Sequence, residues 1–122
     1  MTSDQTVQVE QLIQDYLAAW NASDSDKRAM LLDQVMTSDC IYADSHLPNL
    51  VETQELHGQF IEQFRSKFPE LQISLTSTPD THHGFFRFGW QLAKPTGDVF
   101  TKGVFFGEIS QEGKISKLVG FV

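Results

Sequence analysis

FFRFGWQLAKPTGDVFTKGVFFGEI, residues 85–109, is the stretch that decides the fold. Phe85–Leu92 and Val99–Ile109 are rich in aromatic and β-branched residues, which favour strands. Lys94–Asp98 lies between them and has the Pro and Gly of a turn. The stretch therefore predicts a β-hairpin, and two glycines in its longer second strand permit curvature or bulges.

Three further strands are expected around this hairpin. Leu71–Leu75 alternates apolar and polar residues with a period of two. Ile115–Val122 follows a Gly-containing turn and forms the last strand. Cys40–Ala43 has no helical period and runs into a loop, so it predicts a short strand with Asp44 at its end.

The remaining segments predict three helices, all N-terminal to the hairpin. Residues 9–20 carry apolar side chains on one helical stripe. Asn21–Asp26 ends this helix, and Ser25 or Asp24 can cap the next one. The second helix buries Ala29, Leu32, Val35 and Met36, and the third buries Leu56, Phe60, Ile61, Phe64 and Phe68. Pro69 ends the third helix, although Gly58 inside it is a mild argument against a helix there.

This order of elements predicts one α+β domain over residues 1–122. Three amphipathic helices would cover one face of an antiparallel sheet. A sheet that curls around the helices leaves a hollow, and ten Phe residues supply apolar side chains to line it. The expected shape is a cone with an internal, mostly apolar pocket.

Charge and cysteine content exclude several classes of function. The net charge of −7 and the lack of a basic run make nucleic acid and anionic membranes poor partners. The single Cys40 excludes an internal disulfide, and its apolar neighbours favour a structural role. The ligand spacing of a metal site and the Gly-rich phosphate loop are both missing, so we expect no metal and no cofactor. The polar N-terminus and the lack of a long apolar run predict a cytoplasmic protein.

Four short strings occur in an order that resembles a known group of proteins. They are YLAAWN (16–21), YAD (42–44), HH followed by RFGW (82–83 and 87–90), and GKI (113–115). Together they resemble the nuclear transport factor 2-like superfamily, and in particular its SnoaL-like, polyketide cyclase-like branch. The resemblance implies a cystatin-like cone, a pocket between helices and sheet, and a homodimer formed through the outer sheet face. It does not imply one reaction, because the superfamily includes isomerases, cyclases, dehydratases and transport factors.

Asp44 is the strongest candidate for a catalytic residue. A carboxylate at a strand end that faces an apolar pocket can act as a general base. The isomerases and cyclases that the chain resembles have such a residue in the matching region. The alternative is that Asp44 caps the following loop through its own backbone.

Tyr16 matches the helix position from which the isomerases donate a hydrogen bond to the substrate oxyanion. It can equally be a core residue with a satisfied hydroxyl. Phe105 falls where the isomerases have a second, acidic donor. Because Phe cannot donate a hydrogen bond, the resemblance does not extend to ketosteroid-type isomerisation with a full donor pair.

His82 and His83 are adjacent, so in a regular strand only one can face the pocket. Side chains alternate between the two faces of a strand, so His82 lies on the same face as Phe88 and Trp90. This face is the more apolar one, and we assign His82 inward as an acid or base near Asp44. A bulge near Gly84 would reverse this, and a structural His is the alternative. Arg87 shares the other face, where it pairs with an acidic group or, if the parity is wrong, binds an anionic group of the substrate.

Large aromatic side chains are expected to form the pocket walls or simply the core. They are Tyr16, Trp20, Tyr42, Phe88, Trp90 and Phe105. The favoured hypothesis is a lyase, isomerase or cyclase that acts on a small, hydrophobic, carbonyl-containing ligand. The alternatives are a non-catalytic ligand-binding protein and a dimeric interaction module.

Overall fold

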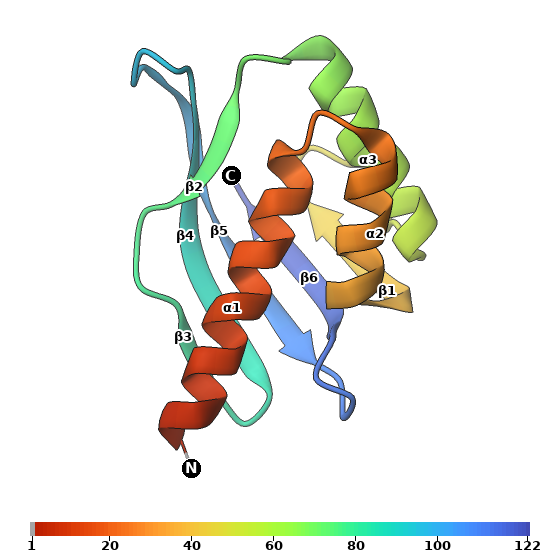
Figure 1. Ribbon diagram of the computed structural model, residues 1–122, viewed down its shortest axis with the longest axis vertical. Helices are drawn as coiled ribbons and strands as arrows, with labels where there is room; N and C mark the ends of the chain where they lie inside the picture. The colour runs from red at the N-terminus through yellow and green to blue at the C-terminus, as the bar shows by residue number, and fades with distance from the viewer. Residues whose placement is uncertain (1) are drawn as a thin grey trace.

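The computed structural model describes residues 2–122, with side chains from residue 7 onward. Over these residues the helices all lie on one side of a curved, open sheet (Figure 1). In chain order the elements are α1 (Thr2–Asn21), α2 (Ser25–Val35), β1 (Met36–Asp44), α3 (Gln54–Lys67), β2 (Gln72–Leu75), β3 (Asp80–His82), β4 (Phe85–Ala93), β5 (Val99–Ile109) and β6 (Ile115–Phe121). The α+β class is confirmed.

The sheet has the strand order β1-β6-β5-β4-β2. The short strand β3 pairs with β4 on the same edge as β2, at the other end of β4. All neighbouring strands are antiparallel except β1 and β6, which run parallel. A wholly antiparallel sheet was expected from the sequence, and this detail is wrong. A short turn forces antiparallel pairing between successive strands, whereas β1 and β6 are separated in the chain by every other strand and are free to pair in parallel.

One element boundary and one additional strand also differ from the expectation. Met36 begins β1 instead of ending the second helix, and the pairing of β1 with β6 is irregular between Met36 and Ile41. β3 was not expected, because Asp80–His82 is only three residues long and has a single β-branched residue. It forms because its backbone completes the edge of the sheet beside β4.

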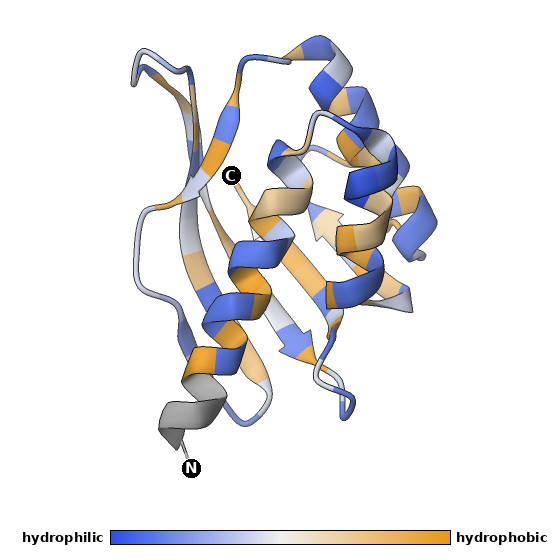
Figure 2. Cartoon of the chain, in the orientation of Figure 1, coloured by the Kyte–Doolittle hydropathy of each residue, from blue (hydrophilic) through white to orange (hydrophobic). Residues whose placement is uncertain are grey.

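The apolar stripe of α1 faces the sheet and forms the centre of the core. Ile13, Tyr16 and Ala19 are fully buried, and Leu17 and Trp20 are nearly so. Hydrophobic and hydrophilic bands alternate along α1, as a helix with one buried side requires (Figure 2). The stripe is completed by side chains that point inward from β4, β5 and β6.

α2 and α3 pack against each other at close range. Gly58 of α3 lies where a Cβ atom would be 3.3 Å from Leu32 Cδ1 of α2, which explains why a glycine is accepted inside a helix. Arg28 of α2 is buried and donates hydrogen bonds to the carbonyl oxygens of Ala19 and Ala22, and it pairs with Glu62 of α3. This one guanidinium thereby links all three helices. Among the described residues, every helix is too short or too polar to cross a membrane.

Candidate functional site

Aromatic rings from the helices and the sheet fill the space between these two layers. Phe105 of β5 is at the centre of the cluster, with ring centroids 5.3 Å from Trp90, 5.5 Å from Phe88 and 6.1 Å from both Tyr16 and Tyr42. All five side chains are buried. The residues expected to line the pocket are therefore brought together, but their rings occupy the interior, and an open internal pocket stays a prediction.

Asp44 is the last residue of β1 and lies at the edge of this ring cluster. Its Oδ2 accepts a hydrogen bond of 2.8 Å from the Tyr42 hydroxyl, and its Oδ1 accepts one of 2.8 Å from the backbone N–H of His46. Tyr42 and Asp44 are two residues apart in a strand and so point to the same face. Asp44 therefore does cap its loop, while its carboxylate also contacts a hydroxyl of the interior.

A buried hydrogen-bond network lies on the helix side of the cluster. The Trp20 indole Nε1 donates to the Tyr16 hydroxyl at 2.8 Å, and this hydroxyl is 2.8 Å from Nε2 of His57. His57 belongs to α3 and is fully buried. The tyrosine and the histidine are 41 residues apart in the chain.

Burial keeps both members of this pair uncharged. Loss of hydration raises the pKa of the Tyr16 phenol well above 10.0. The same effect lowers the pKa of His57 from 6.5 to about 3. Near neutral pH the network is therefore a phenol next to a neutral imidazole.

The Tyr42 ring joins the buried network to the carboxylate. Its centroid is 4.3 Å from that of His57, and its hydroxyl is bonded to Asp44. Desolvation raises the pKa of Tyr42 as well, so this hydroxyl stays protonated and can donate. The candidate site is the set Tyr16, Trp20, Tyr42, Asp44 and His57, with Phe88, Trp90 and Phe105 as its apolar wall.

Two ring nitrogen atoms in and beside this site lack a partner. They are His57 Nδ1 and Trp90 Nε1, which are buried without a hydrogen bond among the described side chains, as is the hydroxyl of Thr37 in the irregular first part of β1. Buried polar groups are normally paired, so unpaired ones in an aromatic interior point to a missing partner.

His57 is the member of the site that the sequence analysis missed. It precedes Phe60 and Ile61 by three and four residues, which places it on the apolar stripe of its helix. A histidine on such a stripe is a visible signal.

The inward assignment of His82 is wrong. His83 and Gly84 both have positive φ angles, 52° and 80°, as a two-residue hairpin turn requires. The chain reverses there, so His82 pairs with Phe85 and shares its outward face instead of continuing the parity of β4. His82 and His83 are both exposed, with their Nδ1 atoms 2.9 Å apart.

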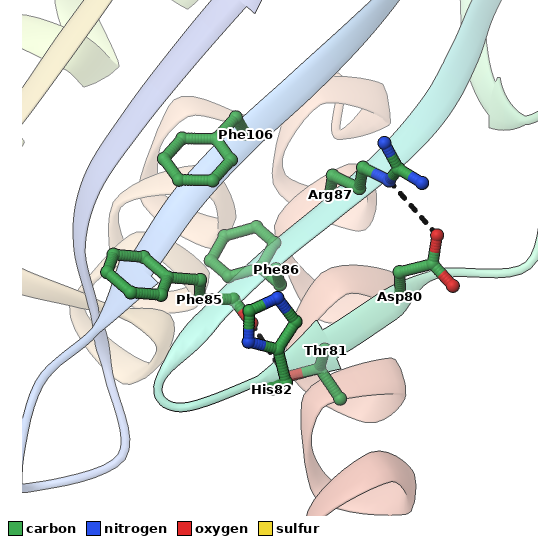
Figure 3. A pocket seen from close by; sticks show the side chains of 7 residues that line it. All are labelled: Asp80, Thr81, His82, Phe85, Phe86, Arg87 and Phe106. Carbon is green, nitrogen blue, oxygen red and sulfur yellow. Dashed lines mark hydrogen bonds and ion pairs between the residues drawn. The ribbon is translucent and has the colours of Figure 1, made fainter.

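Arg87 also lies on the outer face of the sheet. Its Nε is 3.0 Å from Oδ2 of Asp80, and both side chains are well exposed. With His82, Phe85 and Phe106 they line a shallow outer pocket of about 510 Å³ (Figure 3). Neither Arg87 nor His82 is brought to the interior site, and the pairing of Arg87 with an acidic group is the alternative that the structure favours.

Cys40 is buried beside Met36, with 3.9 Å between their sulfur atoms. Burial raises the pKa of its thiol to about 11, so it stays protonated. Within the described part of the chain, His, Cys, Asp and Glu side chains form no group of three or more that could hold a metal ion.

Comparison with known proteins gives matches among solved structures only. No protein-family profile matches the sequence. A search of curated proteins finds no match either.

Among the solved structures is a proposed isomerase of the SnoaL-like family from Agrobacterium tumefaciens. It is 36% identical, has a TM-score of 0.86, and the match covers 94% of this chain and 97% of that one. A proposed SnoaL-like polyketide cyclase from Jannaschia has 16% identity and a TM-score of 0.74, with coverage of 93% and 83%. An NTF2-like protein of unknown function from Exiguobacterium has 16% identity and a TM-score of 0.69, with coverage of 89% and 95%.

Proposed function

The chain belongs to the SnoaL-like family, and on this premise we propose that it is a cofactor-independent isomerase, lyase or cyclase for a small hydrophobic carbonyl compound. The observation that carries the proposal is the position of Asp44. Its carboxylate lies at the edge of an apolar aromatic interior and is bonded to the Tyr42 hydroxyl. A carboxylate in such a place is suited to removing a proton from carbon.

In the proposed reaction Asp44 takes a proton from the carbon next to the carbonyl group. The C–H bond breaks, the proton goes to a carboxylate oxygen, and the electron pair moves through the carbon to the carbonyl oxygen. The hydrogen bond from the His46 backbone orients the carboxylate, and the Tyr42 hydroxyl holds its other oxygen until a ligand enters. Return of the proton to another atom of the enolate gives isomerisation. Loss of a leaving group from the enolate gives elimination, and its attack on a second carbonyl group gives cyclisation.

The developing negative charge on the carbonyl oxygen needs a hydrogen-bond donor. Tyr16 and His57 are the polar groups on the helix side of the same interior, and both are uncharged there. The rings of Phe88, Trp90 and Phe105 would contact the apolar part of the ligand and exclude water. Exclusion of water strengthens each hydrogen bond to the reacting atoms.

Hydrogen–deuterium exchange tests the role of Asp44 without knowledge of the natural substrate. A panel of hydrophobic ketones and 1,3-dicarbonyl compounds is incubated with the protein in D₂O, and exchange at the carbon next to the carbonyl is followed by NMR. For compounds that the native protein exchanges, Asp44→Asn should lower the rate by about 10²–10⁴-fold.

The matched control is Asp39→Asn, which removes the same charge from an exposed position on the same strand. It should keep the native rate within about twofold. An Asp44→Asn protein that exchanges its compounds as fast as the native one would overturn the assignment of Asp44 as the base.

A non-catalytic ligand-binding protein is the second candidate, and Phe105 is the observation that favours it. This side chain is buried at the centre of the interior and cannot donate to an oxyanion. A ligand that is carried through purification unaltered, together with no exchange of any compound of the panel, would favour this function over catalysis.

We also propose that two copies of the chain associate through the outer face of the sheet. Val104, Phe106 and Phe121 are 44%, 40% and 61% exposed there, and Val104 pairs directly with Phe121 between β5 and β6. Two ion pairs neutralise four charged side chains of this face, Arg87 with Asp80 and Lys117 with Glu108, and Lys102 adds one positive charge. Such a face is largely apolar and has little net charge, which suits contact with an identical surface.

A further inference from the structure

The network of Tyr16, Trp20 and His57 has three polar protons but only two hydrogen bonds. Tryptophan can only donate, so the Nε1–H of Trp20 uses one lone pair of the Tyr16 oxygen. Tyr16 retains a single hydroxyl proton. The neutral imidazole of His57 also has one proton, on either Nε2 or Nδ1.

The two tautomers of His57 leave different groups unpaired. With the proton on Nδ1, Nε2 accepts the Tyr16 hydroxyl and only the Nδ1–H lacks a partner. With the proton on Nε2, this N–H donates to Tyr16, and both the Tyr16 hydroxyl proton and the bare Nδ1 lack partners. Each unpaired buried polar group lowers stability, so the Nδ1–H tautomer, which leaves fewer of them, is favoured.

The Tyr16 hydroxyl proton is therefore already used inside the protein. The donor left over in this network is the Nδ1–H of His57. A second unpaired N–H, that of Trp90, lies in the same interior, and its ring stacks on Phe105 at 5.3 Å. Since both unpaired groups are donors, the missing partner is an acceptor.

We propose that the Nδ1–H of His57 donates a hydrogen bond to the carbonyl or enolate oxygen of the ligand, and that Tyr16 and Trp20 are positioning residues that hold His57 in this tautomer. The inference deepens the proposed function, on which its choice of a carbonyl ligand rests. It assigns the oxygen-binding role to a residue of α3 instead of to Tyr16. A neutral imidazole can serve as the electrophile toward a carbonyl oxygen.

Access to this donor requires movement of a ring, because Nδ1 is sealed from solvent. The Tyr42 ring lies against the imidazole with a centroid separation of 4.3 Å, and its hydroxyl is bonded to Asp44. Displacement of this ring would open space beside the imidazole and release a lone pair of the carboxylate. Donor and base would thus become available on the two sides of one ligand.

Nitrogen-15 NMR of histidine-labelled protein reads the tautomer directly. The signal of His57 is identified by its loss in His57→Gln. We expect a neutral imidazole with the proton on Nδ1, and the same result in Asp44→Asn. A proton on Nε2 in the native protein would overturn the proposal.

The probe for the ligand oxygen is 4-nitrophenol, whose coloured phenolate resembles an enolate oxygen on an apolar ring. It should shift the resonance of the Nδ1 proton in a saturable way. If the probe leaves this proton unchanged at any concentration, whether or not it binds elsewhere, the proposal fails.

Two variants separate oxygen binding from a merely structural role. His57→Asn keeps a donor at the Nδ1 position, and His57→Gln keeps a partner for Tyr16 at the Nε2 position. The His57→Gln variant should bind the probe about 10–100-fold more weakly than the native protein, and the His57→Asn variant within about threefold of it. Stability should follow the opposite order, with His57→Gln more stable than His57→Asn. Equal probe binding by His57→Gln and the native protein would refute the donor role, whatever the outcome of the exchange experiment on Asp44.

Discussion

His57 is a neutral histidine because of where it is buried. The imidazole is fully enclosed by rings, with Tyr16 from α1 and Tyr42 from β1 as its neighbours, and its charged form would lose hydration without gaining a counter-ion. Asp44, the acidic member of the site, is bonded to Tyr42 and not to the imidazole. Burial in the core is therefore the cause of the low pKa of His57, about 3.

The stability of the protein should fall when the pH is lowered below the ordinary pKa of histidine. The unfolded chain binds a proton at His57 near pH 6.5, while the folded chain binds it only near pH 3. Between these values the unfolded state has more protons, so the free energy of unfolding rises with pH, by up to about 1.4 kcal/mol per unit. From pH 7 to pH 5 the loss assigned to His57 is about 2 kcal/mol.

Urea unfolding of the native protein and of His57→Gln at pH 7 and pH 5 measures this contribution. The two proteins differ only at residue 57, so the difference between the two pH dependences isolates the histidine. Parallel pH dependences would mean that His57 is protonated in the folded protein.

At the scale of the strands, aromatic rings on the inner face lie over glycines of the neighbouring strand. Phe86 pairs with Gly107, Trp90 with Gly103, and Phe105 with Gly120. A Cβ atom at Gly107 would be 2.3 Å from the ring of Phe86 and 2.6 Å from the backbone oxygen of Lys117. The glycines therefore make room for rings that would otherwise not fit on a curved sheet.

Gly107→Ala should destabilise the protein by about 1–3 kcal/mol, because the added methyl group overlaps both a packed ring and backbone. Thermal or urea unfolding checks this value. Lys102→Ala on the exposed side of the same strand is the control and should change the free energy of unfolding by less than about 0.5 kcal/mol. A Gly107→Ala protein as stable as the control would show that the sheet relaxes around the ring.

At the scale of the whole molecule, one layer of helices covers one face of the sheet and leaves the other open (Figure 1). The covered face holds the candidate site. The uncovered face exposes the apolar side chains of β5 and β6. The proposed association and the proposed ligand binding therefore use opposite faces of the same sheet.

Val104→Glu should convert the proposed dimer into a monomer, because it buries a charge near its symmetry-related copy. Light scattering coupled to size exclusion should give twice the chain mass of 13.8 kDa for the native protein and the single mass for the variant. Met30→Glu makes the same change at an exposed position on α2 and should remain dimeric. A native protein that is monomeric at micromolar concentration would contradict the dimer.

The sequence by itself determined the fold class, the order of all elements except β3, and most of the core. This is because the period of the apolar residues tells which side of a helix or strand is buried, and Tyr16, Phe88 and Phe105 all face inward as their elements require. The position of Asp44 at a strand end was visible in the same way.

Only the tertiary structure decided which of these side chains meet. Periodicity is local, so it could not show that Tyr16 and His57, 41 residues apart, share a hydrogen bond, or that β1 pairs with β6 in parallel. It also failed at His82, because two residues with positive φ reverse the chain and restart the alternation of inner and outer positions. The strands and helices are thus encoded by local sequence, whereas the hydrogen bonds of the site, and the donor that they leave unpaired, form only when these elements pack together.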